Sequence, residues 1–180
     1  PLRYFVQFSY FGKAYHGWQN QPNAITVQEV LEKALSTLLR EKVEVVGAGR
    51  TDAGVHAKQM FCHMDVDSIS DIDELVYRLN AFLPDDIAVQ AIFPVIDTAH
   101  ARFDAIERTY EYWLVKEKSP LLFDYAHLVK HPLNLPSMNR AAQLMLNYTD
   151  FECFSKSNTD VKTFKCDVRE AVWTVDKEKW

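Results

Sequence analysis

Cysteine, glycine and long apolar runs are all scarce in this chain of 180 residues. Its cysteines, Cys62, Cys153 and Cys166, are odd in number and far apart, which argues against a disulfide framework and fits a reducing compartment. The sequence has no C-x-x-C motif, so it does not predict a metal site. No stretch approaches the roughly 18 consecutive apolar residues of a membrane span, so no spanning helix is expected.

Positive charge is not in excess either. The net charge is −5, and residues 1–97 carry 8 Lys and Arg against 13 Asp and Glu, whereas residues 98–180 carry 12 of each kind. A basic domain is the usual footprint of a nucleic-acid-binding protein. Composition alone therefore gives no indication of such a partner, although it leaves room for a local basic surface.

The first half of the chain alternates between two periodicities. Residues 26–39 and 71–83 carry apolar side chains at helical spacing, and Thr26 followed by Glu29 predicts a capping box at the first helix. β-rich runs predict strands at 3–10, 43–49, 59–66 and 87–95. The resulting order, β-α-β-β-α-β, is that of a ferredoxin-like α+β half. We expect this half to span residues 1–97.

The order then restarts over residues 98–180. We expect a long strand within 101–117, an irregular connection at 119–136, a helix over 137–149 with Ser137 as its N-cap, and a final strand in 162–180. These elements make only β-α-β, half of a second ferredoxin-like unit. We therefore expect the native protein to continue well beyond Trp180.

The loop GAGRTDAGVHA, residues 47–57, holds three of the five glycines around Asp52. One interpretation is a tight hairpin in which Asp52 forms an Asx-turn. A phosphate cradle is a second, although the Lys-Ser/Thr of a P-loop is missing. The third is a catalytic aspartate displayed by the loop and flanked by Arg50. Composition does not choose among these interpretations.

The exact residues of the loop favour one of these three interpretations. GRTDAGVHA closely resembles the signature of tRNA pseudouridine synthases of the TruA family. Three further stretches are similar to motifs of that family and come in its order: FSYFGKAYHGWQNQPNAITVQEVLEKAL, LNAFLPDDIAV and ARFDAIERTYEYWL. The resemblance runs from residue 8 to 114 and thins after that to DFECFSK and CDVREAVW.

The resemblance implies a pseudouridine synthase fold, in which two ferredoxin-like halves share one mostly antiparallel sheet, with the second half incomplete here. It implies an isomerase that turns uridine into pseudouridine at positions 38–40 of the tRNA anticodon stem-loop, without cofactor or metal, in a cytoplasmic homodimer. The family's third motif, a strand whose Arg or Lys pairs with the catalytic aspartate, is not found in this chain. Arg169 is not a substitute, because its segment matches an earlier part of the family.

The same resemblance assigns the residues of the site. Asp52 becomes the catalytic aspartate, and its role stays open among attack on C6, attack on C1′ and removal of a proton from C2′. Arg50 becomes the residue that contacts the RNA when the base is flipped out, and Tyr110 the tyrosine that stacks on the uracil. His56, Arg102 and Arg108 complete the predicted binding residues. The two arginines, on the segment leading to Tyr110, are either residues of the binding cleft or solvated strand charges.

Several readings stay open at this level. His56 either shapes the loop or touches phosphate, and the histidine and tryptophan of YHGWQ, His16 and Trp18, either pack or face the RNA. A non-catalytic RNA-binding module is one rival function, since ferredoxin-like sheets present aromatic side chains to single strands. A small hydrolase using Asp52 as base or nucleophile is another, and it would not need residues 98–180.

Overall fold

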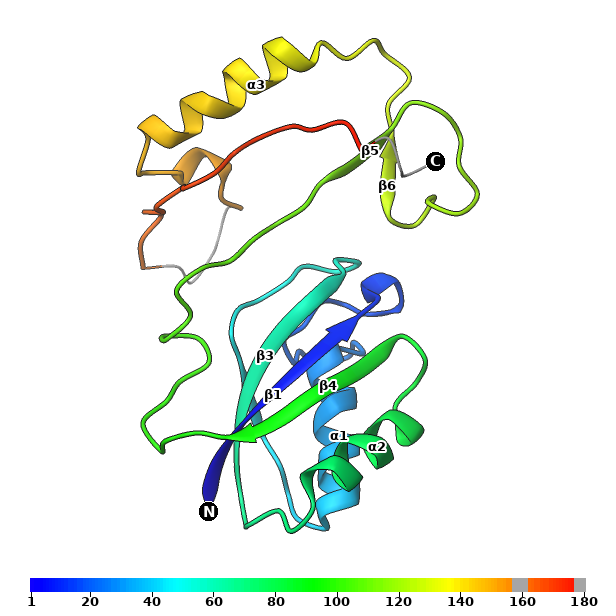
Figure 1. Cartoon of the computed structure of the whole chain (residues 1–180), viewed down its shortest axis with the longest axis vertical. Coiled ribbons are helices and arrows are strands. Elements are labelled where there is room, and N and C mark those ends of the chain that lie inside the picture. The colour runs from blue at the N-terminus through cyan, green and yellow to red at the C-terminus, as the bar shows by residue number, and fades with distance from the viewer. Residues whose placement is uncertain (157–161, 177–180) are drawn as a thin grey trace. The chain divides into compact units, whose positions relative to one another are not determined.

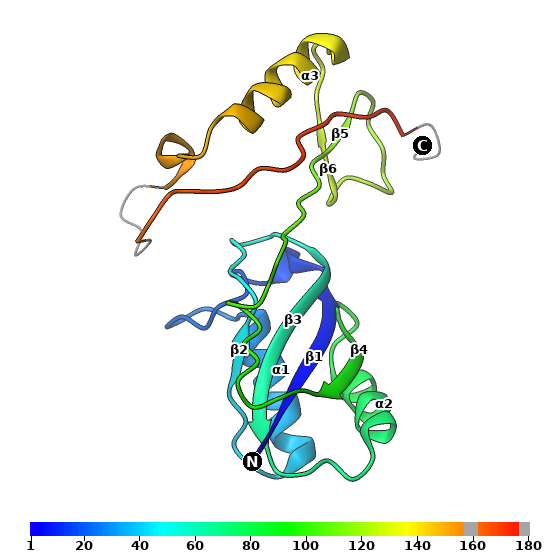
Figure 2. The same ribbon diagram turned by 60° about the vertical axis from the view of Figure 1, so that its left-hand side comes forward.

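The computed structural model describes residues 1–156 and 162–176. It divides into two compact units, Pro1–Tyr110 and Glu111–Trp180. Each unit is described by itself below, beginning with the first, whose strands and helices are labelled in Figures 1 and 2.

The first unit contains the six predicted elements in the predicted order. They are β1 (Leu2–Tyr10), α1 (Val27–Leu39), β2 (Val45–Gly47), β3 (Ala57–Val66), α2 (Ile72–Phe82) and β4 (Ile87–Pro94), with a short 3-10 turn, η1 (Gly12–Ala14), after β1. The strands form one sheet in the order β2-β3-β1-β4, and every neighbouring pair is antiparallel. The predicted α+β class and the β-α-β-β-α-β half are therefore confirmed.

The core of this unit follows from the alternation of β1. Tyr4, Val6, Phe8 and Tyr10 are buried, whereas the residues between them are only partly covered. Strand side chains alternate between the two faces of a sheet, so these four lie on one face. That face packs against α1 and α2, which cover the same side of the sheet in Figures 1 and 2.

Both helices of the first unit begin at side-chain caps. Thr26 Oγ1 accepts a hydrogen bond from the backbone N–H of Glu29 at 3.3 Å, and Asp71 Oδ1 accepts one from Glu74 at 2.9 Å. Each bond satisfies an amide that the first turn leaves without a helical partner. The capping position predicted at Thr26 is confirmed.

Side chains from the helices also hold the two edge strands. Asn80 of α2 donates to the carbonyl of Val89 and accepts from its N–H, both at 2.8 Å. On the opposite edge, Gln28 donates to the carbonyl of Val45 at 3.1 Å, and Glu32 accepts from its N–H at 2.9 Å. Backbone groups at the sheet edges thereby gain partners that no further strand supplies.

The regular elements of the second unit differ from those that the sequence predicts. Its described elements are β5 (Trp113–Val115), β6 (Ala126–Leu128), α3 (Leu135–Leu144) and the 3-10 turns η2 (Met145–Asn147) and η3 (Glu152–Phe154). β5 and β6 form a two-stranded parallel sheet of their own, and β6 lies in the segment 119–136 that was expected to be irregular. The helix predicted over 137–149 begins earlier, because Asn134 and not Ser137 is its N-cap; Asn134 Oδ1 accepts from the N–H of Ser137 at 2.9 Å.

Two strand predictions in this region are wrong. The long strand within 101–117 is reduced to Trp113–Val115, and residues 162–176 form no strand beyond one bridge between Asp150 and Lys165, while 177–180 lie outside the described residues. The sequence alternation is real, but an extended segment becomes a strand only beside a partner that completes its hydrogen bonds. Side chains of α3 take that place: Asn139 bonds both backbone groups of Trp173, at 2.7 and 2.9 Å.

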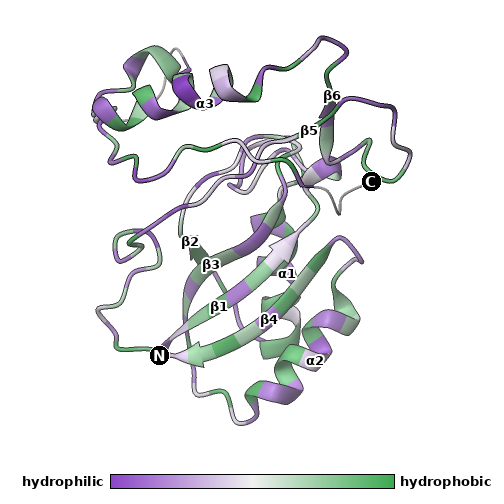
Figure 3. Cartoon of the chain, turned by 45° about the horizontal axis from the view of Figure 1, so that its top comes forward, coloured by the Kyte–Doolittle hydropathy of each residue, from purple (hydrophilic) through white to green (hydrophobic). Residues whose placement is uncertain are grey.

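The buried apolar side chains belong almost entirely to the first unit. Among the described residues of the second, only Ala142 is a buried hydrophobic residue. Large apolar side chains there stay exposed, for example Leu121 at 75% and Phe154 at 78%. Figure 3 shows hydrophobic residues on the strands and helices of the first unit and also along the loops of the second.

Within the described part of the chain, no helix is long and apolar enough to cross a membrane. The three cysteines are free thiols; Cys62 is buried, and burial raises the pKa of its thiol.

Candidate active site

The loop of residues 48–56 connects β2 to β3 and carries Asp52 on its exposed side. The backbone N–H of Val55 donates to the carbonyl of Asp52 at 3.2 Å, which closes a turn over residues 52–55. Gly54, the third residue of that turn, has φ of +80°. This backbone conformation is the one that a type II turn requires at that position, and glycine adopts it at least cost.

The segment after β1 supports the loop from behind. The N–H of Trp18 donates to the carbonyl of Thr51 at 3.3 Å, and the N–H of Gly54 donates to the carbonyl of Tyr15 at 3.2 Å. Gly17 has φ of +80°, and a Cβ built there would stand 2.2 Å from the Thr51 carbonyl oxygen. Only glycine lets the two backbones approach this closely.

His56 is bound to the same segment. Its Nδ1 accepts a hydrogen bond from the backbone N–H of Gly12 at 2.9 Å, and its ring stacks on Phe11 with centroids 4.1 Å apart and planes 12° apart. Because Nδ1 accepts a hydrogen bond, a neutral His56 carries its proton on Nε2. Of the two readings of His56, these contacts favour the one in which it shapes the loop.

Trp18 is part of the core. Its side chain is 3% exposed, stacks on Phe8 at a centroid distance of 5.0 Å, and lies where a Cβ on Gly47 would be. The packing reading of Trp18 is therefore the correct one, and its ring does not face solvent.

Tyr10 also supports the loop. Its hydroxyl forms a 2.8 Å hydrogen bond with Thr51 Oγ1, next to Asp52. The ring is only 4% exposed, and burial raises the pKa of Tyr10. Sequence reasoning did not single out Tyr10, Gly12 or Gly17. The alternation of β1 could have done so for Tyr10, since it places a phenol on the buried face, where its hydroxyl needs a partner.

The segment after β4 brings the other predicted residues toward the loop. Arg108 Nη2 donates to the carbonyl of Ala48 at 2.6 Å and to that of Arg102 at 3.0 Å. Tyr110 is 72% exposed, and its phenol contributes to the raised pKa of Tyr10. The structure thus connects Arg108 and Arg102 to the Asp52 loop, and Tyr110 electrostatically to Tyr10.

A buried histidine anchors the start of that segment. His63 of β3 is 5% exposed, and its Nδ1 accepts from the N–H of Ala101 at 3.1 Å. Burial, together with Arg3 and His100, lowers the pKa of His63. Asp65 acts in the opposite direction and partly offsets this lowering. Arg3 in turn pairs with Asp65 through two hydrogen bonds of 2.7 and 2.8 Å, so the charges around the ring are partly balanced.

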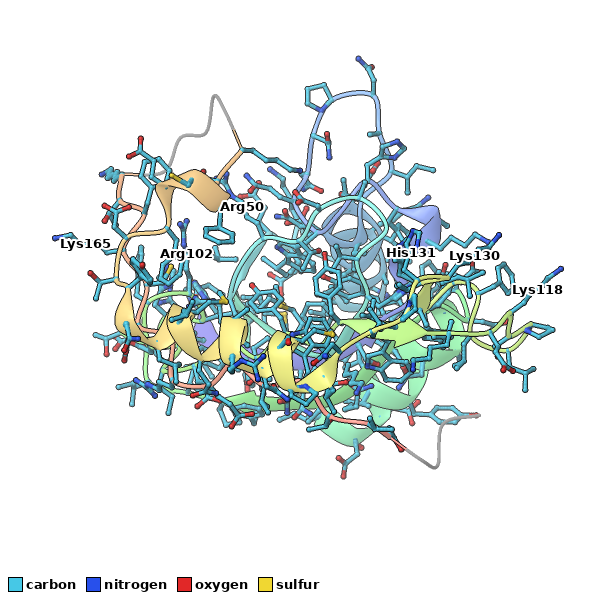
Figure 4. All side chains as sticks on the ribbon, turned by 90° about the horizontal axis from the view of Figure 1, so that it is seen from above. Arg50, Arg102, Lys118, Lys130, His131 and Lys165 are labelled. Carbon is cyan, nitrogen blue, oxygen red and sulfur yellow. The ribbon has the colours of Figure 1, made fainter. Side chains whose placement is uncertain are left out.

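Arg50, Arg102 and Arg108 are all exposed. Figure 4 shows Arg50, from the Asp52 loop, and Arg102, from the segment after β4. Among the described residues Arg50 has no hydrogen bond or ion pair, whereas the Arg102 guanidinium lies 5.9 Å from the ring centroid of Phe103. An exposed guanidinium without a protein partner can bind phosphate through its fork of N–H donors.

Basic side chains also gather within the second unit. Lys118, Lys130 and His131 follow the ends of β5 and β6, and Figure 4 shows them on neighbouring segments of the chain. They gather because the two strands are parallel and so end on the same side. In the part of the chain that the structure describes, His, Cys, Asp and Glu side chains nowhere gather in threes as a metal site would need.

Comparison with known proteins gives one consistent family. A family model described as tRNA pseudouridine synthase matches residues 7–104. The chain is 48% identical to tRNA pseudouridine synthase A of Bacteroides fragilis over 177 residues, covering 98% of this chain and 70% of the relative. It is 46% identical to that of Parabacteroides distasonis, covering 99% and 71%, and 39% identical to that of Chlorobium luteolum, covering 93% and 67%.

Proposed function

The chain belongs to the tRNA pseudouridine synthase family of isomerases, and on that premise we propose that it isomerises uridines in the anticodon stem-loop of tRNA, with Asp52 as its catalytic group. The targets are positions 38, 39 and 40, as the resemblance of its motifs implies. The rearrangement is neither oxidation nor reduction, and we propose that it needs no cofactor and no metal.

One observation carries this proposal. Asp52 is the exposed carboxylate of a loop that is held at several points: its backbone by Trp18 at Thr51 and by Tyr15 at Gly54, and the His56 side chain by Gly12. A loop that merely connects two strands needs no such support. A carboxylate that must meet a reacting carbon within a fraction of an ångström does need it, because catalytic groups act from fixed positions.

The proposed reaction requires one carboxylate beside the sugar and the base of the uridine. The bond between N1 and C1′ of the uridine breaks, the base turns, a bond forms between C5 and C1′, and the proton of C5 leaves while N1 gains one. An ionised Asp52 serves as nucleophile at C6 or C1′, or as base at C2′. Each route places one carboxylate oxygen within about 3 Å of the nucleotide.

The flanking residues serve the extrusion of the base. A uridine within a stem has to leave the stack before a side chain can reach it, at a cost of a few kcal/mol. Tyr110 is exposed and can stack on the freed uracil, which offsets roughly 1–3 kcal/mol. Arg50 binds the neighbouring phosphate or fills the space that the base leaves.

The remaining residues complete the proposal. Arg102 contacts the tRNA backbone, while Arg108 and His56 hold the loop from its two sides. We also propose a cytoplasmic homodimer, because a chain of net charge −5 binds tRNA best when basic residues of two copies lie along one path. Residues 1–97 would form the half with the aspartate loop and residues 98–180 part of the second half.

The test follows tritium released from tRNA labelled at uridine C5. We expect release by the wild-type protein and none above background by Asp52→Asn, which keeps the size of the side chain and removes its charge. Asp73→Asn, at an exposed acid in the first turn of α2, is the matched control and should release tritium at the wild-type rate. If the wild-type protein bound tRNA but released no tritium from any unmodified tRNA, the chain would be an RNA-binding module and not an isomerase.

A further inference from the structure

Asp52 stands on a loop, but the residue before it is held by the core of the sheet. Thr51 is tied twice: its carbonyl accepts from the N–H of Trp18 at 3.3 Å, and its Oγ1 bonds the hydroxyl of Tyr10 at 2.8 Å. The carbonyl bond fixes the peptide that leads into Asp52. The hydroxyl bond fixes the rotation of the Thr51 side chain.

The Tyr10 end of this contact is rigid. Tyr10 is the last residue of the central strand β1 and pairs with β3 at Ala57 and with β4 at Ile87. Its ring is stacked on Phe8 at a centroid distance of 6.0 Å and is 4% exposed. The hydroxyl therefore has one accessible position, set by the sheet and not by the loop.

Burial also decides the chemical state of this hydroxyl. Removal from water raises the pKa of Tyr10, the hydrogen bond with Thr51 opposes that rise, and the nearby Tyr110 adds to it. The net shift is upward, which favours the neutral phenol. A neutral hydroxyl both donates and accepts, so its bond to Thr51 persists whichever way the Thr51 proton points.

From these contacts we propose that Tyr10 and Thr51 are a positioning pair, which carries the rigidity of the central strand to the backbone of Asp52 and so sets where its carboxylate stands. The inference rests on the proposed function, since Asp52 must be catalytic for its position to matter. Tyr10 itself touches neither the substrate nor the reacting atoms in this proposal.

The effect of the Tyr10–Thr51 pair on catalysis can be distinguished from its effect on stability, because the chain contains a matched control tyrosine. Tyr4 lies on the same strand and the same face, is 3% exposed, and its hydroxyl accepts one hydrogen bond, from the N–H of Ile69 at 3.2 Å. Tyr4→Phe and Tyr10→Phe thus remove equivalent buried hydroxyls. Only the second removes a contact to the loop.

The experiment measures kcat and KM for tRNA by tritium release, and the unfolding midpoint, in wild type and five variants. They are Tyr10→Phe, Thr51→Val, the double variant, Thr51→Ser and Tyr4→Phe. We expect Tyr10→Phe and Thr51→Val each to lower kcat about 10-fold, with KM within twofold of wild type. The double variant should be no slower than the slower single one, because both remove the same bond. Thr51→Ser, which keeps the hydroxyl, should retain most of the wild-type kcat.

Two other outcomes are decisive. If Tyr10→Phe and Tyr4→Phe lowered the unfolding midpoint equally and left kcat equal to wild type, Tyr10 would be an ordinary core residue and the inference would be wrong. If the wild-type protein itself released no tritium, the proposed function would fail first, which the wild-type measurement shows before any variant is compared.

Discussion

The most demanding test of how the Asp52 loop is held is the substitution Gly17→Ala. A Cβ at this position would stand 2.2 Å from the backbone oxygen of Thr51, whereas real Cβ atoms essentially never approach closer than 3.0 Å. The two backbones must therefore separate by at least 0.8 Å, the difference between those two distances. Neither atom belongs to a flexible side chain that could rotate away, so the loop itself has to shift.

The cost has two parts. The φ of +80° at Gly17 costs an L-residue about 1–2 kcal/mol. Displacing the Thr51 carbonyl also weakens the bond from the Trp18 N–H, which contributes about 1 kcal/mol. We expect a loss of about 2–3 kcal/mol in the free energy of unfolding. A shift near 1 Å in the Asp52 backbone should lower kcat about 100-fold at 25 °C.

Gly54→Ala separates these two parts. Gly54 has the same φ of +80°, but a Cβ there meets no atom within 4 Å. Its free energy of unfolding should fall by about 1–2 kcal/mol only, from the backbone term. Chemical denaturation gives both free energies of unfolding, and steady-state tritium release gives kcat for Gly17→Ala. If Gly17→Ala were no less stable than Gly54→Ala and kept its kcat, the close approach of the two backbones would have no role in catalysis.

Three further predictions concern other parts of the chain. Because the pKa of His63 is lowered in the folded state, the unfolded chain takes up a proton first as the pH falls. The unfolding temperature should therefore decrease as the pH falls below about 6.5, and level off once the folded state is protonated too. In His63→Gln, the difference in unfolding temperature between about pH 7.5 and about pH 5.5 should be smaller than in wild type. Asn80→Ala leaves both bonded backbone groups of β4 without their side-chain partner and should cost about 1–3 kcal/mol in urea unfolding; a cost near zero would mean that water replaces the amide fully. The double charge reversal Lys118→Glu and Lys130→Glu should reduce the salt dependence of tRNA binding by roughly two in log–log slope, and an unchanged slope would place the RNA elsewhere.

The first unit could be predicted from sequence because its signals are local and agree with one another. Helical spacing, the capping box at Thr26 and the β-rich runs all point to the same six elements. β2 is shorter than predicted, since only Val45–Gly47 pairs with β3.

The second unit could not be predicted in the same way. Alternation in residues 101–112 and 162–176 is a property of the side chains, whereas a strand is a property of two segments together. Sequence patterns give no sign of whether the partner is present. Asn139 shows how the backbone of Trp173 finds its hydrogen bonds instead, from an amide on a helix.

The family resemblance named the residues of the candidate site. It did not name the residues that hold the Asp52 loop in place. Gly12, Gly17 and Tyr10 lie some forty residues before the loop they contact, and their contacts are spatial. The positions of the glycines are the nearest sequence signal for these contacts. All five glycines fall between residues 12 and 54, in the two segments that meet behind Asp52.

The place of β1 in the sheet has a consequence for synthesis. β1 leaves the ribosome before the other three strands of its sheet, and both of its partners there, β3 and β4, come from later sequence. Its last partner ends at Pro94, which is 84 residues after Tyr10. At about 5–20 residues per second, the apolar face of β1 waits roughly 4–17 s for its sheet. During that time the strand depends on α1, or on a chaperone, to keep its four buried side chains from other nascent chains.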